Sequence, residues 1–375
     1  MHNQRMPELR MGNLIASVPI VQGGMGVGIS RAGLAAAVAN TGGIGVIASV
    51  GLDLLNGTPK NRKKGVSVQL LKQEIERARQ LTDGIIGVNV MAALTDFEAL
   101  VDVSIDAGAD VLFMGAGLPL HFSANLTPER LRSLTTKMVP IVSSGRATEL
   151  IFQYWHKKYG RIPDGVVVEG PMAGGHLGFK KEQIDDPHYA LENLVRDTVA
   201  AVAPYADDYG MNIPVIAGGG IYTGQDIYDI MQLGAQGVQM ATRFIATHEC
   251  DADMAFKQAL IDATEKEISI IISPVGLPGR AIRNTFLEQV EAGVQKPFNC
   301  PYKCLKSCDY KTAPYCIALA LSHAQQGRLQ QGFAFTGANG YRVDKMMSVK
   351  ELIDELAGEY CTVARADVMA AVGGE

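Results

Sequence analysis

The chain has 375 residues, a length that suggests two domains or one barrel with an insertion. Hydrophobic residues make up 47% and charged residues 19%, which allows a large core and excludes global disorder. The formal net charge of −5 argues against nucleic acid as a partner. The first 13 residues contain no apolar h-region, so no signal peptide is expected. Five glycines interrupt the apolar stretch 33–55, so no membrane span is expected either. We therefore expect a cytoplasmic protein.

Eight short β-branched runs recur along the chain, and helical patterns separate them. They span residues 19–24, 44–49, 85–91, 111–117, 138–144, 165–170, 214–220 and 237–244. Most are continuously apolar, as expected for parallel strands that are buried on both faces. The alternation predicts an α/β fold, the (β/α)8 TIM barrel, whose chemistry lies at the carboxyl ends of the strands. A doubly wound sheet is the main alternative, but it would not need eight units.

After the eighth strand the pattern changes. Residues 250–335 are mostly helical in pattern and contain a cysteine-rich loop, which predicts a helical insertion over the mouth of the barrel. A last helix is expected to begin with a capping box, in which Ser348 is followed by Glu351 three residues later. We therefore expect a barrel domain of residues 1–249 and 336–375 and an insertion of residues 250–335.

The loops after the seventh and eighth strands carry the strongest chemical signal. Their residues are Gly218, Gly219 and Gly220, then Gln239, Met240, Ala241 and Thr242. In these barrels the two loops form the standard phosphate site, because backbone N–H groups and a helix N-terminus hold the anion. A glycine-rich turn without a ligand is the alternative.

The other strand ends suit a flat ring. The first strand runs into "VQGGMGVG", and Gln22 and Asn89 offer the amide donors and acceptors that the edge of an isoalloxazine requires. One phosphate and one flat ring match FMN. The run "GGMGVG" comes close to a dinucleotide motif, but it fits a barrel loop better.

His176 lies among glycines in "EGPMAGGHLG", directly after the sixth strand. The glycines let the backbone approach a ligand closely. An imidazole, with an unperturbed pKa near 6.5, can hold or donate a proton at working pH. A hydrogen-bonded core histidine is the alternative. His121, in the loop after the fourth strand, is expected to pack that loop rather than to contact substrate.

Five stretches, in order, resemble the nitronate monooxygenase (2-nitropropane dioxygenase-like) family, which also contains FMN-dependent enoyl-acyl-carrier-protein reductases. They are residues 19–49, 87–91, 168–178, 213–227 and 237–244, with weaker matches at 280–284 and 332–356. The resemblance implies FMN as cofactor and His176 as the catalytic base or polariser beside the flavin N5. The phosphate loops map to the residues named above, and ring contacts map to Gly24, Met25, Gly26 and Asn89. We add Ser144, Glu169 and Gly175 as candidate cofactor-binding residues at strand ends.

Three functions follow as hypotheses. The first is oxidation of a small nitronate, with O₂ reoxidising the flavin. The second is NAD(P)H-dependent reduction of an enoyl thioester or quinone, and the third is a flavin-binding scaffold or redox sensor. The basic run 60–64 is expected to be solvated, although it could bind an acyl-carrier protein, a CoA phosphate or the 2′-phosphate of NADPH. Whether the chain forms a homo-oligomer stays open.

A cysteine cluster departs from the family pattern. Cys300, Cys304, Cys308 and Cys316 lie within 17 residues, spaced C-x₃-C-x₃-C-x₇-C. Four thiolates suit a [4Fe–4S] cluster or zinc. Zinc sites usually use two pairs with a longer gap, so the even steps favour iron–sulfur. Unligated thiols are the third interpretation.

Overall fold

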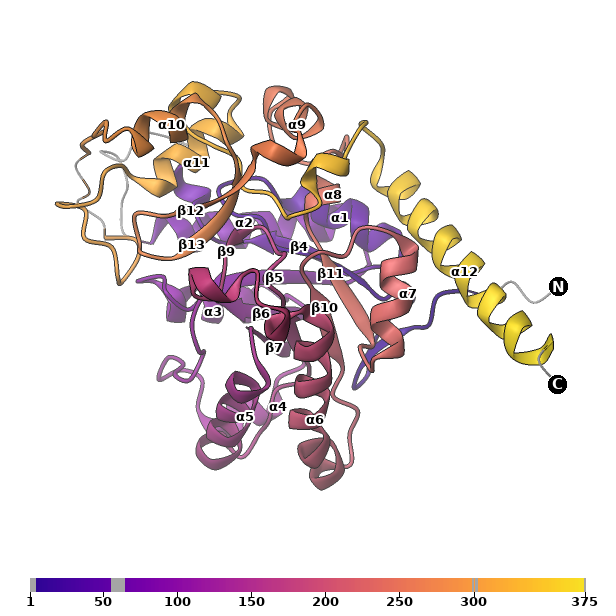
Figure 1. Cartoon of the computed structure of the whole chain (residues 1–375). Helices are drawn as coiled ribbons and strands as arrows, with labels where there is room; N and C mark the ends of the chain where they lie inside the picture. Colours follow the sequence, from indigo (N-terminus) through magenta and orange to yellow (C-terminus); the bar gives the residue numbers. More distant parts are fainter. Residues whose placement is uncertain (1–4, 55–64, 299, 301–302, 374–375) are drawn as a thin grey trace.

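Eight parallel strands form a barrel in the computed structural model, which describes residues 5–54, 65–298, 300 and 303–373, with side chains to residue 370 (Figure 1). The strands are β3 (Ile20–Gln22), β4 (Gly45–Ala48), β5 (Ile86–Met91), β6 (Val111–Gly115), β7 (Lys137–Val142), β8 (Val166–Glu169), β10 (Val215–Gly218) and β11 (Gly237–Met240). Their order is β3-β11-β10-β8-β7-β6-β5-β4. The ring closes where Val21 bridges Ile44 in parallel. All eight predicted strands are present, so the predicted barrel is confirmed.

Helices alternate with these strands. They are α1 (Ala32–Asn40), α2 (Val66–Leu81), α3 (Phe97–Asp106), α4 (Pro128–Ser133), α5 (Gly145–Tyr159), α6 (Leu191–Tyr209), α7 (Gly224–Gln232) and α8 (Thr242–Ile245). Helix α2 shows why they pack as they do: its buried Leu71, Ile75 and Ala78 recur every three to four residues and form one apolar face. In the part of the chain that the structure describes, no helix combines the length and apolar character that crossing a membrane requires.

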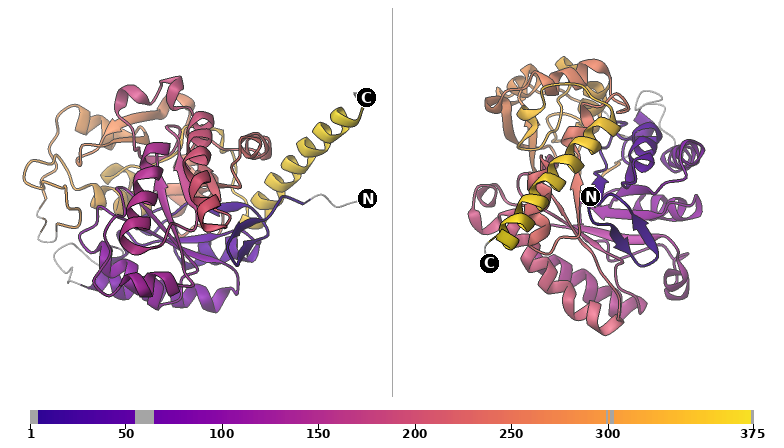
Figure 2. Two further views of the ribbon diagram at one scale, coloured as in Figure 1. Left: turned by 90° about the horizontal axis from the view of Figure 1, so that it is seen from below. Right: turned by 90° about the vertical axis from the view of Figure 1, so that its right-hand side faces the viewer.

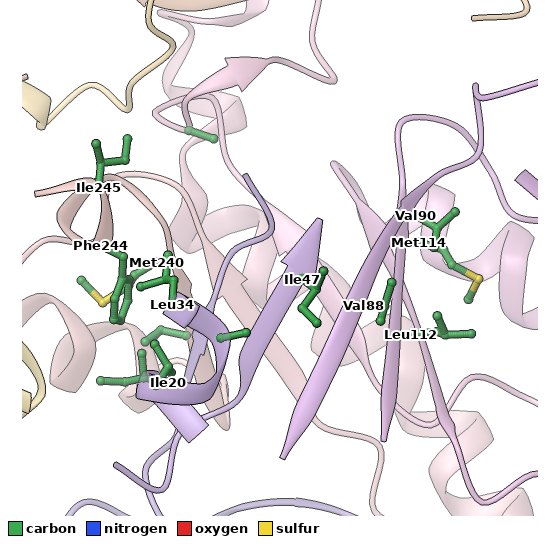
Figure 3. Packing of buried hydrophobic residues seen from close by; sticks show 14 of the residues in the cluster. Ile20, Leu34, Ile47, Val88, Val90, Leu112, Met114, Met240, Phe244 and Ile245 are labelled. Atoms are coloured by element: carbon green, nitrogen blue, oxygen red, sulfur yellow. The ribbon is translucent and has the colours of Figure 1, made fainter. Parts of the chain in front are cut away.

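Alternate residues of each strand face two separate cores. Val167, Phe113 and Ile216 belong to a cluster inside the barrel, which the hairpin β1 (Leu9–Met11) and β2 (Leu14–Ala16) closes from below. The neighbouring strand residues, such as Ile47 and Val88, belong to a second cluster that includes buried residues of the helices (Figure 3). This period of two follows from strand geometry. It also fixes which residues at the strand ends point over the barrel axis.

The segment after β11 is not purely helical. It contains the expected helices α9 (Met254–Ile261), α10 (Thr285–Glu291) and α11 (Ile317–Gln325), but also an antiparallel hairpin of β12 (Ile268–Ile272) and β13 (Pro278–Ile282). The sequence analysis missed this hairpin. Its short apolar run lies between two helical patterns, and its partner is a two-residue strand far away in sequence, β9 (Gly175–His176). The domain boundaries at residues 249 and 336 stay a prediction.

Helix α12 (Val349–Gly373) begins with the expected capping box. The Glu351 N–H donates to Ser348 Oγ at 3.1 Å, and the Ser348 N–H donates to the Glu351 carboxylate at 2.7 Å. The helix packs closely on α7, where a side chain at Gly224 would overlap the Leu356 carbonyl. Its last turns extend past the barrel (Figures 1 and 2).

Candidate functional site

A cavity of about 1220 Å³ lies at the carboxyl ends of the barrel strands. Most of the predicted site residues line it: Gly24, Met25, Gly26, Asn89, Glu169, Gly175, His176, Gly219, Gly220, Gln239, Met240, Ala241 and Thr242. These residues lie between positions 24 and 242 and come from the ends of five barrel strands, β3, β5, β8, β10 and β11. The barrel therefore gathers them at one place, as the strand-end pattern predicts.

Three candidates lie elsewhere. Ser144 caps α5, because its Oγ accepts from the Ala147 N–H at 3.2 Å, and Gly218 is a paired residue within β10. Neither is among the residues that line the cavity. Gln22 is fully buried, and its side-chain oxygen accepts from the Val46 N–H at 3.0 Å, so the expected ring contact is wrong. The Ser144 and Gln22 side chains therefore bond to backbone N–H groups, and the assignment of Ser144 and Gly218 to the cofactor stays a prediction.

His121 also lies outside the cavity lining. Its Nδ1 is 3.1 Å from the Tyr154 hydroxyl and 3.1 Å from Lys158 Nζ, both on α5. The expectation that this histidine packs its loop is confirmed. The basic run 60–64 lies outside the described residues.

The phosphate loop after β10 depends on glycine. Gly219 and Gly220 have φ of +97° and +90°, a region that side chains rarely adopt. A Cβ at Gly219 would lie 2.8 Å from the Gly170 carbonyl, so space forbids a side chain as well. The loop therefore presents bare backbone to the cavity, as an anion site requires.

A second loop, residues 336–339, covers the phosphate loops. The Gly337 N–H donates to Thr242 Oγ1 at 3.0 Å, and the Asn339 amide donates to the Gly220 carbonyl at 2.6 Å. Residues 336–339 all line the cavity. The resemblance over residues 332–356 implies a glycine-rich loop over the flavin, although the sequence analysis named none of these four residues as a site residue.

His176 is held over the cavity by the sheet β12-β13-β9. It pairs with Gly279 of β13, and its ring meets Phe335 edge-on with centroids 5.3 Å apart. The turn before it is fixed by the buried Arg280, which donates to the Pro171 carbonyl at 2.6 Å and to the Ala173 carbonyl at 2.8 Å. Burial lowers the pKa of His176 to about 4, so the imidazole is neutral at pH 7.

Three buried polar atoms along the cavity lining lack a hydrogen-bond partner among the described residues. They are His176 Nε2, Ser49 Oγ and Thr336 Oγ1. A buried polar group without a partner costs about 1–3 kcal/mol, so a polar ligand is the expected partner. The glycine loops suit one phosphate, and Asn89 with these three atoms suits a polar ring edge. The residues present therefore fit FMN; Ser49 was not named from the sequence.

The cysteine cluster adjoins the same cavity. Cys304 lines it, and Cys316 stands at the N-cap of α11. Burial first, with smaller contributions from Cys304 and Cys300, raises the pKa of the Cys316 thiol to about 11, so the three thiols lie near one another. Among the side chains that the structure describes, no group of three or more His, Cys, Asp or Glu is arranged to hold a metal ion. The metal site at the four cysteines stays a prediction.

Comparison with known proteins agrees with this geometry. A family model described as nitronate monooxygenase matches residues 9–100 and 93–359. A protein of Staphylococcus aureus strain Newman named "Probable nitronate monooxygenase" is 28% identical over 308 residues, which is 72% of this chain and 77% of that protein.

Two solved structures are similar over nearly the whole chain. FabK from Thermotoga maritima is 26% identical with a TM-score of 0.70, over 93% of this chain and 94% of that one. The nitroalkane oxidase from Streptomyces ansochromogenes is 25% identical with a TM-score of 0.70, over 93% and 97%. Since the family model spans most of the chain and the barrel brings its motifs to one cavity, the chain belongs to the nitronate monooxygenase family of FMN-dependent oxidoreductases.

Proposed function

We propose that this protein oxidises a small nitronate, with His176 as the residue that orients the substrate beside FMN. Bound FMN supplies the electron acceptor, which O₂ then reoxidises. The observation that carries the proposal is the state of His176: it lines the cavity, its Nε2 is buried without a partner, and it is neutral at pH 7.

A neutral imidazole with a pKa of about 4 is a weak base. It suits a substrate that arrives already deprotonated. A nitronate is the anionic conjugate base of a nitroalkane, so its oxidation needs orientation and polarisation of the nitro group rather than a strong base. In the tautomer that carries its proton on Nε2, His176 donates a hydrogen bond to such an anion, as neutral imidazoles do at other polarising sites.

The surrounding residues keep His176 in place. Arg280 fixes the turn 171–173, and β13 pairs with the histidine backbone. Phe335 covers one edge of the imidazole. An oriented donor in a site without water is worth more than the same donor in solution, because the local dielectric is lower.

The test is which compound bleaches the protein-bound flavin under anaerobic conditions. We expect a preformed nitronate to bleach it faster than the neutral nitroalkane with the same carbon skeleton. The substitution His176→Asn should slow the bleaching by the nitronate and by the nitroalkane. Bleaching by NADH or NADPH alone, with no reaction of the nitronate, would rule the proposal out.

The second candidate is NAD(P)H-dependent reduction of an enoyl thioester or quinone. The size of the cavity favours it, because about 1220 Å³ is more than a flavin with a small nitronate would fill. The cavity lining includes the apolar side chains of Leu94, Phe97, Ile317 and Leu321, which would suit an apolar substrate. Rapid bleaching by one nicotinamide, followed by reoxidation with an enoyl thioester or quinone, would support this function.

The four cysteines carry a separate proposal, a shared [4Fe–4S] cluster with zinc as the alternative. Their mutual proximity and their place at the cavity wall support it, although binding would require the thiols to converge further than they do. Anaerobically prepared protein should contain iron and sulfide in equal amounts. Zinc without iron would make the site structural. Four titratable thiols without metal would overturn both forms of the proposal.

A further inference from the structure

Glu169 occupies an unusual place for a carboxyl group. On β8, Val167 belongs to the cluster inside the barrel and Val168 to the core between strands and helices. By alternation, Glu169 points to the inside, at the last level of the strand. There it lines the cavity together with His176. The exposed part of the Glu169 side chain therefore faces the cavity.

The carboxyl group has no ion-pair or hydrogen-bond partner in the described part of the chain. Its register neighbour on β10 is Gly218, which offers no side chain. The ionisable side chains nearby are His176 on β9, Arg280 on β13, and Arg243 of α8 and Asp53 elsewhere on the lining. None of them contributes to its titration: burial alone raises the pKa of Glu169 to about 7.

We propose that Glu169 is a proton carrier for the bound flavin: under mildly alkaline conditions it is protonated when the flavin holds two electrons and ionised when it does not. When two electrons enter, negative charge is added to the site, and the Glu169 carboxylate takes up one proton from solvent. When the electrons leave to the oxidant, that proton returns to solvent. The electrons come from the organic substrate in turnover. The proposal rests on FMN binding but not on a nitronate being the substrate.

The physical reason is that two like charges in one dry site repel each other. A carboxylate beside a reduced, negatively charged flavin is therefore driven to its neutral form. Below pH 7 Glu169 is already protonated with oxidised flavin, so reduction adds no proton to it. Above pH 7 it is ionised with oxidised flavin, so reduction adds one. The additional proton should therefore appear on the alkaline side of about pH 7.

The test is the pH dependence of the flavin midpoint potential, measured anaerobically against reference dyes from about pH 5.5 to 8.5. The slope counts the protons taken up per two electrons. We expect the wild-type slope above pH 7 to contain one proton more than that of Glu169→Gln, which keeps the shape but cannot ionise. Ionisation of the flavin N1 also affects the slope, but on the acid side, and it persists in the variant.

Glu98→Gln is the matched control, because Glu98 lines the same cavity but is exposed. Its slope should equal that of the wild type. Identical slopes for wild type and Glu169→Gln would overturn the proposal. If Glu169→Gln does not retain FMN, the infrared difference spectrum of wild-type protein labelled with ¹³C-glutamate decides. A protonated-carboxyl band that appears on reduction at pH 8 supports the proposal, and its absence overturns it. Because no substrate is used, failure of the nitronate proposal leaves this result intact.

Discussion

Lowering the assay pH to 5.5 distinguishes a buried, neutral His176 from an ordinary histidine. With a pKa of about 4, roughly 97% of the imidazole is neutral at pH 5.5, whereas a histidine of unperturbed pKa near 6.5 is only about 10% neutral there. If the neutral form is the active one, kcat/KM at pH 5.5 should stay close to its value at pH 7.5. An ordinary histidine would lose about tenfold.

The pH range in which activity is lost follows from the lowered pKa of His176. A lowered pKa means that protonation begins only as the pH falls toward about 4, so activity should be lost in that window and not near pH 6.5. The assay is flavin reduction in a stopped-flow instrument, with preformed nitronate mixed in at each pH so that its own protonation is slow. An inflection near pH 6.5 in the wild-type protein would refute a buried, neutral imidazole.

The matching substitution is His176→Asn. It should retain FMN, because the loop at Gly219 and Gly220 is unchanged, and should lose about 10²–10³-fold in turnover, as when one oriented hydrogen-bond donor is removed. His121→Asn is the control, since His121 contacts Tyr154 outside the cavity. Near-full activity of His176→Asn would make His176 a structural residue.

Three further predictions concern the loops and the last helix. Gly220→Ala should weaken FMN binding at least tenfold in a fluorescence titration, because φ is +90° and a Cβ would lie 3.0 Å from Met172 Cβ. Gly210→Ala is the control: φ is +59°, no atom lies within 4 Å of the added Cβ, and the variant should bind FMN normally. Arg280→Met should lower kcat more than FMN affinity, because it frees the turn before the histidine; equal losses in both would point to general unfolding. Ser348→Ala should lower the free energy of unfolding by about 1 kcal/mol in urea, and no change would mean that the capping box is not formed in solution.

The barrel and most of its site could be predicted from the sequence because they follow local rules. Buried parallel strands need continuous apolar runs, and the residues directly after those runs must meet at one end of the barrel. Gly219, Gly220 and His176 are found in this way. Ser144 and Gln22 show where these rules stop: a hydroxyl or amide at a strand end can bond to a ligand or to a backbone N–H, and in the structure both accept from a backbone N–H.

The missed features depend on contacts between distant segments. The loop 336–339 is joined to the phosphate loops by hydrogen bonds to Thr242 and Gly220, about a hundred positions earlier in the chain. Strand β9 has two residues, and it exists only because β13, about a hundred positions later, pairs with it. No periodicity in a two-residue segment could reveal such a strand.

His176 and Glu169 together indicate what kind of site the barrel builds. Burial shifts both groups toward their neutral forms, lowering the pKa of the imidazole and raising that of the carboxyl. Near pH 7 neither of these two groups therefore contributes a full fixed charge. An anionic substrate beside His176 then meets a neutral hydrogen-bond donor rather than an imidazolium cation. A negative charge that arrives on the flavin can be balanced by a proton on Glu169, and a site of this kind can accept electrons without a fixed ion pair having to be broken.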